Sequence, residues 1–168
     1  LTGLFFYFCG GTLTMQTARQ LYTGRAGTIK RKLSEMMIAM ELERTYSKKE
    51  IIEIFFNTMF YGHRADGIQT AAKTYFNKRV EDITIEEAAV LVGLLQRPSQ
   101  NNPISAPAIA LKRRNNVLYF MFQNDKINRA QFDSLKLLPL VVSPTLKKDP
   151  SPYFRNRLER ELTELGKI

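Results

Sequence analysis

An acid beside two cations is the first candidate for chemistry in this sequence. Arg31 and Lys32 precede Glu35, and methionines and an isoleucine follow the acid. A helix would place Arg31 and Glu35, four residues apart, on one face. The pair is then either an i,i+4 ion pair worth about 0.3 kcal/mol, or an acid in a partly apolar cleft that manages charge developing in a transition state. Spacing alone favours the ion pair.

Two further patterns could carry chemistry. Gly10–Gln16 combines paired glycines with threonines ahead of a predicted helix, which leaves backbone N–H groups for an anion. It lacks the Gly-Lys-Ser/Thr ending of a nucleotide-binding loop, so an ordinary glycine turn with a threonine cap is the alternative. Arg113 and Arg114 form a basic pair in a predicted helix, where a solvated face or a brace to a carboxylate is usual. His63 follows Gly62 in a polar loop, which is typical of a solvated histidine.

Composition narrows the classes of protein. The 168 residues fit one ordinary domain, and 44% hydrophobic residues exclude wholesale disorder. One Cys excludes an internal disulfide framework and a multi-cysteine zinc site, and one His argues against His-rich metal sites and a Ser–His relay. The net charge is +9, concentrated in residues 1–49 and 111–168 around a near-neutral middle. This pattern indicates an anionic partner: nucleic acid, a membrane surface or a phosphorylated substrate.

The elements that must position these residues are predicted to be helices. Ser47 with Glu50 and Thr84 with Glu87 fit capping boxes, as Asn128 with Gln131 does more weakly. Apolar residues recur at helical spacing, and only residues 137–142 suggest an extended segment. Proline-rich residues 143–152 predict a linker. The expected helices are 12–22, 28–46, 48–58, 66–76, 84–96, 107–123, 128–136 and 152–165.

The order of these motifs resembles that of the peptidoglycan glycosyltransferases (family 51), the glycosyltransferase domain of class A penicillin-binding proteins. Gly10–Gln16 resembles that family's Gly-Gly-Ser-Thr-x-Thr-x-Gln, and residues 31–35 match Arg-Lys-x-x-Glu. Lys48–Asn57 resembles Lys-x-Glu-Ile-Leu-Glu-x-Tyr-Leu-Asn, and residues 113–118 match Arg-Arg-x-x-Val-Leu. Residues 98–103 resemble Pro-Ser-x-Tyr-Asn-Pro. The likeness covers residues 10 to about 142.

The resemblance implies roles for individual residues. Glu35 takes the place of the second family glutamate and is expected to be catalytic, assisting the departing pyrophosphate directly or through a divalent cation such as Mg or Mn; no organic cofactor is expected. Arg19 takes the place of a phosphate-contacting lysine, where a guanidinium can grip two oxygens. The other expected substrate contacts are Thr12, Gln16, Arg25, Arg31, Lys32 and Asn102. Residues expected to be structural are Lys48, Glu53, Asn57, Gly62, Arg113 and Arg114.

Several positions depart from the family pattern. The family's first motif, which holds its general base, has no counterpart in Leu1–Phe8, so the chain is interpreted as an N-terminally incomplete piece of something longer. Gly11 stands at the usual serine position, Phe55 at a tyrosine and Asn101 at another tyrosine. The absent base predicts weak substrate binding and little or no polymerisation.

The fold implied by the resemblance is mostly α, a lysozyme-like domain with a cleft beside a small membrane-facing lobe. The implied reaction polymerises lipid II into glycan strands and releases undecaprenyl pyrophosphate, an inverting displacement at the outer face of the cytoplasmic membrane. Expected partners are lipid II, the nascent glycan and an anionic membrane surface, without nucleic acid. Residues 1–142 would form the glycosyltransferase domain, and 143–168 a linker and the start of a transpeptidase-side module. Arg19, Arg31 and Lys32 should converge with Glu35 on one pyrophosphate-sized site.

Two other classes of function remain open. One is a non-catalytic fragment that still binds the lipid-linked substrate. The other, supported only by charge, is a basic helical nucleic-acid-binding module. Such a module needs exposed aromatics among its basic residues, whereas Phe55, Phe56 and Tyr75 lie on helices predicted to be packed.

Overall fold

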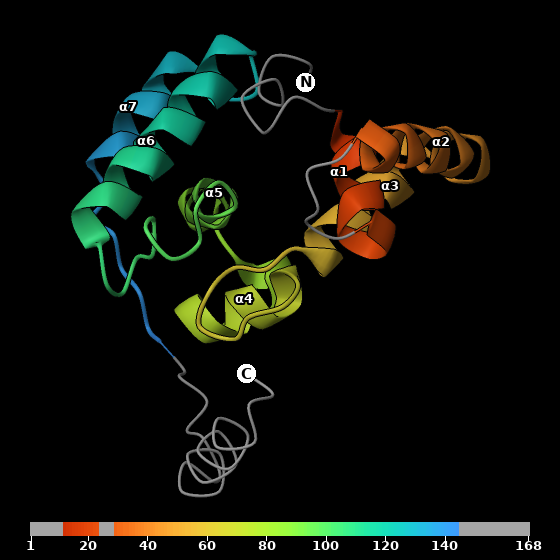
Figure 1. The fold of residues 1–168 in the computed structure, drawn as a ribbon. Helices are drawn as coiled ribbons and strands as arrows, with labels where there is room; N and C mark the ends of the chain where they lie inside the picture. The colour runs from red at the N-terminus through yellow and green to blue at the C-terminus, as the bar shows by residue number, and fades with distance from the viewer. Residues whose placement is uncertain (1–11, 24–28, 145–168) are drawn as a thin grey trace, which may run out of the picture.

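The computed structural model describes residues 12–23 and 29–144, and this part of the chain is mostly helical (Figure 1). A π-helical turn, Arg19–Thr23, continues directly from α1, and a 3-10 turn, Val80–Asp82, precedes α5. The expected helix 152–165 lies outside the described residues. The helices are α1 (Leu13–Ala18), α2 (Ile29–Thr45), α3 (Lys48–Thr58), α4 (Ile68–Phe76), α5 (Ile85–Leu94), α6 (Pro107–Gln123) and α7 (Arg129–Leu137).

Local capping sets several of the helix starts. Ser47 accepts the Glu50 N–H and donates its own N–H to Glu50 Oε2 at 2.8 Å, so α3 begins with the predicted capping box. Thr84 donates its N–H to the Glu87 carboxylate at 2.9 Å ahead of α5. Asn128 and Gln131 form the same reciprocal pair ahead of α7. These bonds satisfy N–H groups that a helix start leaves without partners.

The predicted extended segment 137–142 is not a strand. Residues 138–143 run without a ladder partner, and the described residues contain only one isolated bridge, Phe60 with Asp66. Leu140 and Val142 instead pack against the core, and the Ser143 N–H donates to the Tyr75 carbonyl at 2.9 Å. The apolar residues are therefore explained by packing against the helices.

The helices form two neighbouring groups. In Figure 1, α1 lies beside α2 and α3 at one side, while α6 and α7 run together at the other side, with α5 between α6 and α4. The larger core cluster lies on α4, α5 and the loop before α4, around Tyr61, Tyr75, Leu91 and Leu94. A second cluster joins α5, α6 and α7 through Ala89, Leu118, Ile127 and Phe132. Among the described residues, no helix is long and apolar enough to cross a bilayer.

Candidate phosphate-binding site

Two helices position the candidate site. Glu35 lies on α2, on the face that also carries the buried Ala39 and Leu42, because residues four and seven positions apart share one side of a helix. The short helix α1 packs on α2, and its C-cap residue is Arg19. The π-helical turn that begins at Arg19 is a rare geometry that is frequent at functional sites.

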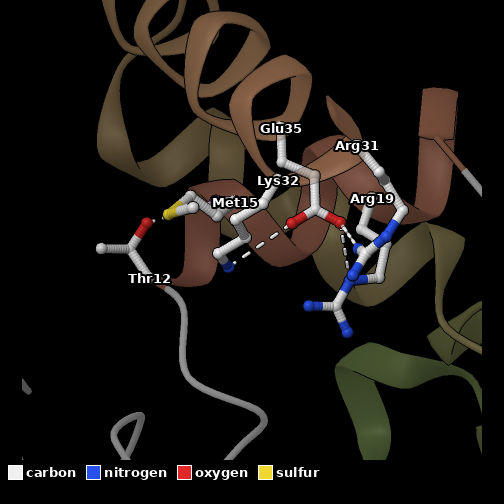
Figure 2. Close-up of polar contacts among 6 residues, drawn as sticks. All are labelled: Thr12, Met15, Arg19, Arg31, Lys32 and Glu35. Carbon is white, nitrogen blue, oxygen red and sulfur yellow. Dashed lines mark hydrogen bonds and ion pairs between the residues drawn. The ribbon is translucent and has the colours of Figure 1, made fainter. Parts of the chain in front are cut away.

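Three cations meet the Glu35 carboxylate (Figure 2). Arg19 Nε donates to Oε1 at 3.0 Å, and Arg31 Nη1 pairs with the same oxygen. Lys32 Nζ lies 3.4 Å from Oε2, on the other side of the carboxylate. The spacing in α2 predicts the two local pairs, and the resemblance predicts the arrival of Arg19 from a separate helix. We call Arg19, Arg31 and Lys32 the cation cluster.

The cluster surrounds a buried acid while its own side chains reach solvent. Glu35 has a side-chain exposure of 0%, whereas Arg19, Arg31 and Lys32 are 29%, 18% and 41% exposed. Burial by itself would raise the pKa of Glu35, but the Arg19 hydrogen bond and the charges of Arg19, Arg31 and Lys32 outweigh it, so that the pKa lies below its ordinary value. Glu35 is therefore ionised at neutral pH.

The charges of these four side chains do not cancel. Three positive charges against one carboxylate leave a net charge of +2 on side chains that are partly exposed to solvent. Guanidinium groups bind phosphate oxygens in bidentate fashion, and an ammonium group acts as a compact point charge. The arrangement can therefore hold an anion with two or more negative charges, of which pyrophosphate is an example.

The same residues do not fit a divalent cation. In the described part of the chain, no group of three or more His, Cys, Asp or Glu side chains could hold a metal ion. Mg²⁺ requires several oxygen ligands, whereas Glu35 offers one carboxylate among three positive side chains that would repel the ion. The expected role of Mg or Mn at Glu35 is thus disfavoured by the donor set, and no step is assigned to a metal.

Comparisons with known proteins identify the family. The family described as Transglycosylase matches residues 9–122. The chain belongs to the transglycosylase family. Penicillin-binding protein 1A of Aquifex aeolicus is 38% identical over 145 residues, which are 86% of this chain and 20% of the relative. A putative transglycosylase of Cupriavidus necator is 40% identical over 129 residues, 77% of this chain and 56% of the relative.

A solved structure supports the same assignment. The crystal structure of penicillin-binding protein 1A from Haemophilus influenzae superposes with a TM-score of 0.57 at 25% sequence identity, covering 94% of this chain and 20% of that one. The mostly helical fold of this transglycosylase domain thus matches a class A penicillin-binding protein. The chain spans about a fifth of this protein and of the Aquifex aeolicus relative.

Two other expected substrate-binding residues of the transglycosylase chain, Thr12 and Gln16, lie on or beside α1. The Thr12 hydroxyl caps α1 by accepting the Met15 N–H at 3.2 Å (Figure 2), and its residue remains exposed. Gln16 is half-buried on α1, one turn before Arg19. Arg25 and Gly11 lie outside the described residues. Thr12 and Gln16 thus share the short helix that carries Arg19.

Asn102 lies in a different setting from the one expected. Its side chain is 3% exposed and donates to the Tyr75 hydroxyl at 2.9 Å, while its Oδ1 accepts the N–H groups of Ile104 and Ser105. The Tyr75 hydroxyl in turn donates to the Tyr61 carbonyl at 2.6 Å. These bonds occupy the amide inside the protein, so the structure favours a bracing role over the expected substrate contact.

The residues expected to be structural have diverse surroundings. Arg114 is 1% exposed, and its guanidinium donates to the carbonyls of Lys136 and Pro139 and to the Asn115 side chain. Burial lowers its pKa, against the favourable charge of Glu86. Gly62 has a φ of 82°, a backbone conformation that favours glycine. Arg113 is half-buried beside Gly93, and three further members are exposed on α3: Lys48, Glu53 and Asn57.

Spacing did not reveal every contact that shapes this region. Arg114 is a brace, but to carbonyl groups and not to the carboxylate considered from sequence. Thr14 donates its hydroxyl to Glu43 Oε1 at 2.6 Å, a contact between α1 and α2 that no local pattern indicated. The sequence showed only that Glu35 and Glu43 lie eight residues apart on the same predicted helix. This spacing does not identify Thr14 as the partner of Glu43.

Proposed function

We propose that this chain is a peptidoglycan glycosyltransferase domain whose cation cluster takes the pyrophosphate of a lipid-linked sugar substrate. The observation that carries the proposal is the convergence of Arg19, Arg31 and Lys32 on the buried Glu35 carboxylate. The four side chains together keep a net positive charge. Membership of the transglycosylase family supports a glycosyl-transfer reaction, and the reaction proposed here is glycan polymerisation from lipid II. In this reaction the sugar 4-hydroxyl of the acceptor attacks the anomeric carbon, and undecaprenyl pyrophosphate leaves with its electron pair.

The cluster would lower the barrier by neutralising charge that develops on the leaving group. Arg19 and Arg31 would each offer N–H donors to phosphate oxygens, and Lys32 would add a third positive charge. Glu35, ionised at neutral pH, cannot donate a proton in that state. Its proposed part is to hold the three cations together before substrate arrives, which avoids the cost of assembling like charges during the reaction.

The base that deprotonates the acceptor is proposed to come from a first-motif glutamate, for which residues 1–9 offer no counterpart. A positioned general base contributes roughly 10²–10⁴-fold to a rate. We therefore expect this chain by itself to bind lipid II weakly and to polymerise it poorly. Purely non-catalytic binding of the lipid-linked substrate is the second candidate function. It differs from the first in predicting that the chain binds lipid II but does not polymerise it.

An exposed apolar surface on α2 supports a position at the membrane. Ile29, Leu33, Met36, Met37 and Met40 are all exposed on the helix that carries Arg31 and Lys32. Apolar side chains beside cations favour an anionic membrane surface. We propose that this region forms the small membrane-facing lobe beside the substrate cleft, at the outer face of the cytoplasmic membrane. Fusion to a transpeptidase domain, as the resemblance implies, is part of the same proposal.

A lipid II polymerisation assay tests the proposed function. The chain, and a form extended upstream with a first motif, would each be compared with Arg19→Ala and Arg31→Ala variants. Lys30→Ala is the matched control, because it removes one positive charge from an exposed neighbouring position on α2. We expect the extended form to polymerise, the cluster variants to lose most activity and the control to retain it. Equal rates for cluster and control variants would contradict the proposal. A salt-dependent DNA shift without lipid II binding would favour the nucleic-acid-binding alternative.

A further inference from the structure

The contact between Thr14 and Glu43 has no part in the proposed chemistry. Thr14 is a buried residue of α1, and its hydroxyl donates to Glu43 Oε1 at 2.6 Å, across 29 positions of sequence. A hydroxyl-to-carboxylate bond of this length belongs to the charge-assisted class, which is stronger and more directional than a neutral hydrogen bond. The contact therefore fixes one point of α1 against one point of α2.

A second polar contact fixes the same two helices elsewhere. Arg19 at the end of α1 meets Glu35 on α2. Glu35 and Glu43 are separated by about 12 Å along α2, since a helix rises about 1.5 Å per residue. The two contacts thus lie toward opposite ends of the helix pair, which Figure 1 shows lying side by side.

The fully buried residues of α1 are small, so their packing against α2 contributes little to the register of the two helices. The buried residues of α1 are Thr14, Thr17 and Ala18, and the Thr17 hydroxyl is used within α1, where it donates to the Leu13 carbonyl at 3.0 Å. Burial of apolar area is not directional, and small side chains interdigitate little. The register of α1 along α2 consequently depends on the polar contacts at its two ends.

One of these two contacts involves a group that is proposed to bind the anion. A phosphate group at Arg19 would share its guanidinium with Glu35, so the α1 contact at that end would be weakened by substrate. The Thr14–Glu43 bond does not involve the cation cluster and stays in place. We propose that Glu43 is a positioning residue of the phosphate site, which acts through Thr14 to hold α1 in the register that presents Arg19 beside Glu35. This inference rests on the proposed function.

Pyrophosphate binding, measured by titration calorimetry on the whole chain, separates positioning from simple electrostatics. Glu43→Ala removes a negative charge that lies about 12 Å along α2 from Glu35, so charge alone predicts unchanged or slightly tighter binding of inorganic pyrophosphate. Positioning predicts the opposite, a weakening of about fivefold or more, because Arg19 no longer holds its place. Glu43→Gln keeps an oxygen acceptor for Thr14 and should restore most of the affinity. Glu41→Ala, at an exposed position of the same helix, is the matched control and should bind at least as tightly as the unmodified chain.

The donor side gives an independent pair of variants. Thr14→Ser keeps the hydroxyl and should bind pyrophosphate normally, whereas Thr14→Val keeps the shape, loses the bond and should weaken binding like Glu43→Ala. Unchanged or tighter binding in both Glu43→Ala and Thr14→Val would overturn the inference.

A double-mutant cycle distinguishes this inference from the proposed function. Urea unfolding would be measured for Thr14→Val, Arg19→Ala and the double variant. If Thr14 positions Arg19, the loss of stability from Arg19→Ala should be smaller in the Thr14→Val background. Absence of pyrophosphate binding by the unmodified chain would refute the proposed function, while the cycle would still decide the positioning role. Additive effects in the cycle would refute that role.

Discussion

Replacing Glu35 with glutamine tests how the site is held together. The carboxylate is fully buried and meets three positive side chains, so Glu35→Gln leaves those cations without their shared counter-ion. Removal of one partner from a fully buried ion pair costs about 3–5 kcal/mol. The cations here are 18% to 41% exposed and keep part of their hydration. Solvent screening lowers the expected loss to about 2 kcal/mol at neutral pH.

The pH dependence of this loss gives the prediction its sign. The pKa of Glu35 in the folded chain lies below the ordinary value of 4.5. Ionised Glu35 therefore contributes stability that is fully present above about pH 5 and is lost as the pH falls through the folded pKa. Once Glu35 is protonated it resembles glutamine in charge, so the unmodified chain and the variant should converge in stability under acid conditions.

Urea denaturation followed by far-ultraviolet circular dichroism measures this difference. At pH 7 the midpoint should fall by about 1 M, for a slope of about 2 kcal/mol/M. Glu41→Gln, on the exposed side of α2, should change stability by less than about 0.5 kcal/mol. A Glu35→Gln variant as stable as the unmodified chain at pH 7, or a difference that stays constant down to pH 3, would refute the assignment of Glu35 as the counter-ion of the cluster.

Three further substitutions test the frame around the site. Arg114→Met leaves the carbonyls of residues 136 and 139 without their side-chain donor. The free energy of unfolding should fall by about 1–3 kcal/mol, and hydrogen exchange at residues 138–143 should become faster. Unchanged exchange there would contradict the bracing role of Arg114. Gly67→Ala puts a Cβ 2.7 Å from the Asn57 carbonyl at a φ of +80°, so thermal unfolding should show a loss of about 1–3 kcal/mol or more. Ser47→Ala removes the α3 cap and should cost about 1 kcal/mol by urea unfolding, with Ser47→Gly costing less.

Contacts between residues close in sequence were the most predictable. The capping pairs at Ser47 and Asn128 depend on three-residue spacing, and the structure has both. Arg31 and Lys32 meet Glu35 for the same reason, since one helical turn brings them together. These contacts can be predicted from the sequence because they form as soon as the local segment becomes helical, whatever the rest of the fold does.

Contacts between helices required more than spacing. Arg19 reaches Glu35 only after α1 packs on α2, and its expected place came from the family resemblance. The burial of Arg114 was not predicted, because its partners are carbonyl groups 22 and 25 residues away, and every residue offers a carbonyl. Residues 137–142 were predicted to form a short extended segment because they are apolar. Apolar content alone does not show whether such a segment pairs with a strand or packs against helices, and here it packs against helices.

Polar contacts at two points join the short helix α1 to α2. Helix α1 has six residues, too few to be stable in isolation, and its buried residues are small. Arg19 at one end and Thr14 near the other make polar contacts with α2, and we propose that these contacts set the register of α1. The Arg19 guanidinium contacts Glu35 on α2 and is also proposed to bind phosphate. Packing of α1 on α2 and anion binding therefore involve the same charged group. Because the four clustered side chains keep a net charge of +2, a bound anion would offset any attraction lost at Glu35 and would relieve repulsion among the cations. Under the proposed function, the cluster would exchange its counter-ion for substrate while the Thr14–Glu43 contact keeps α1 in place.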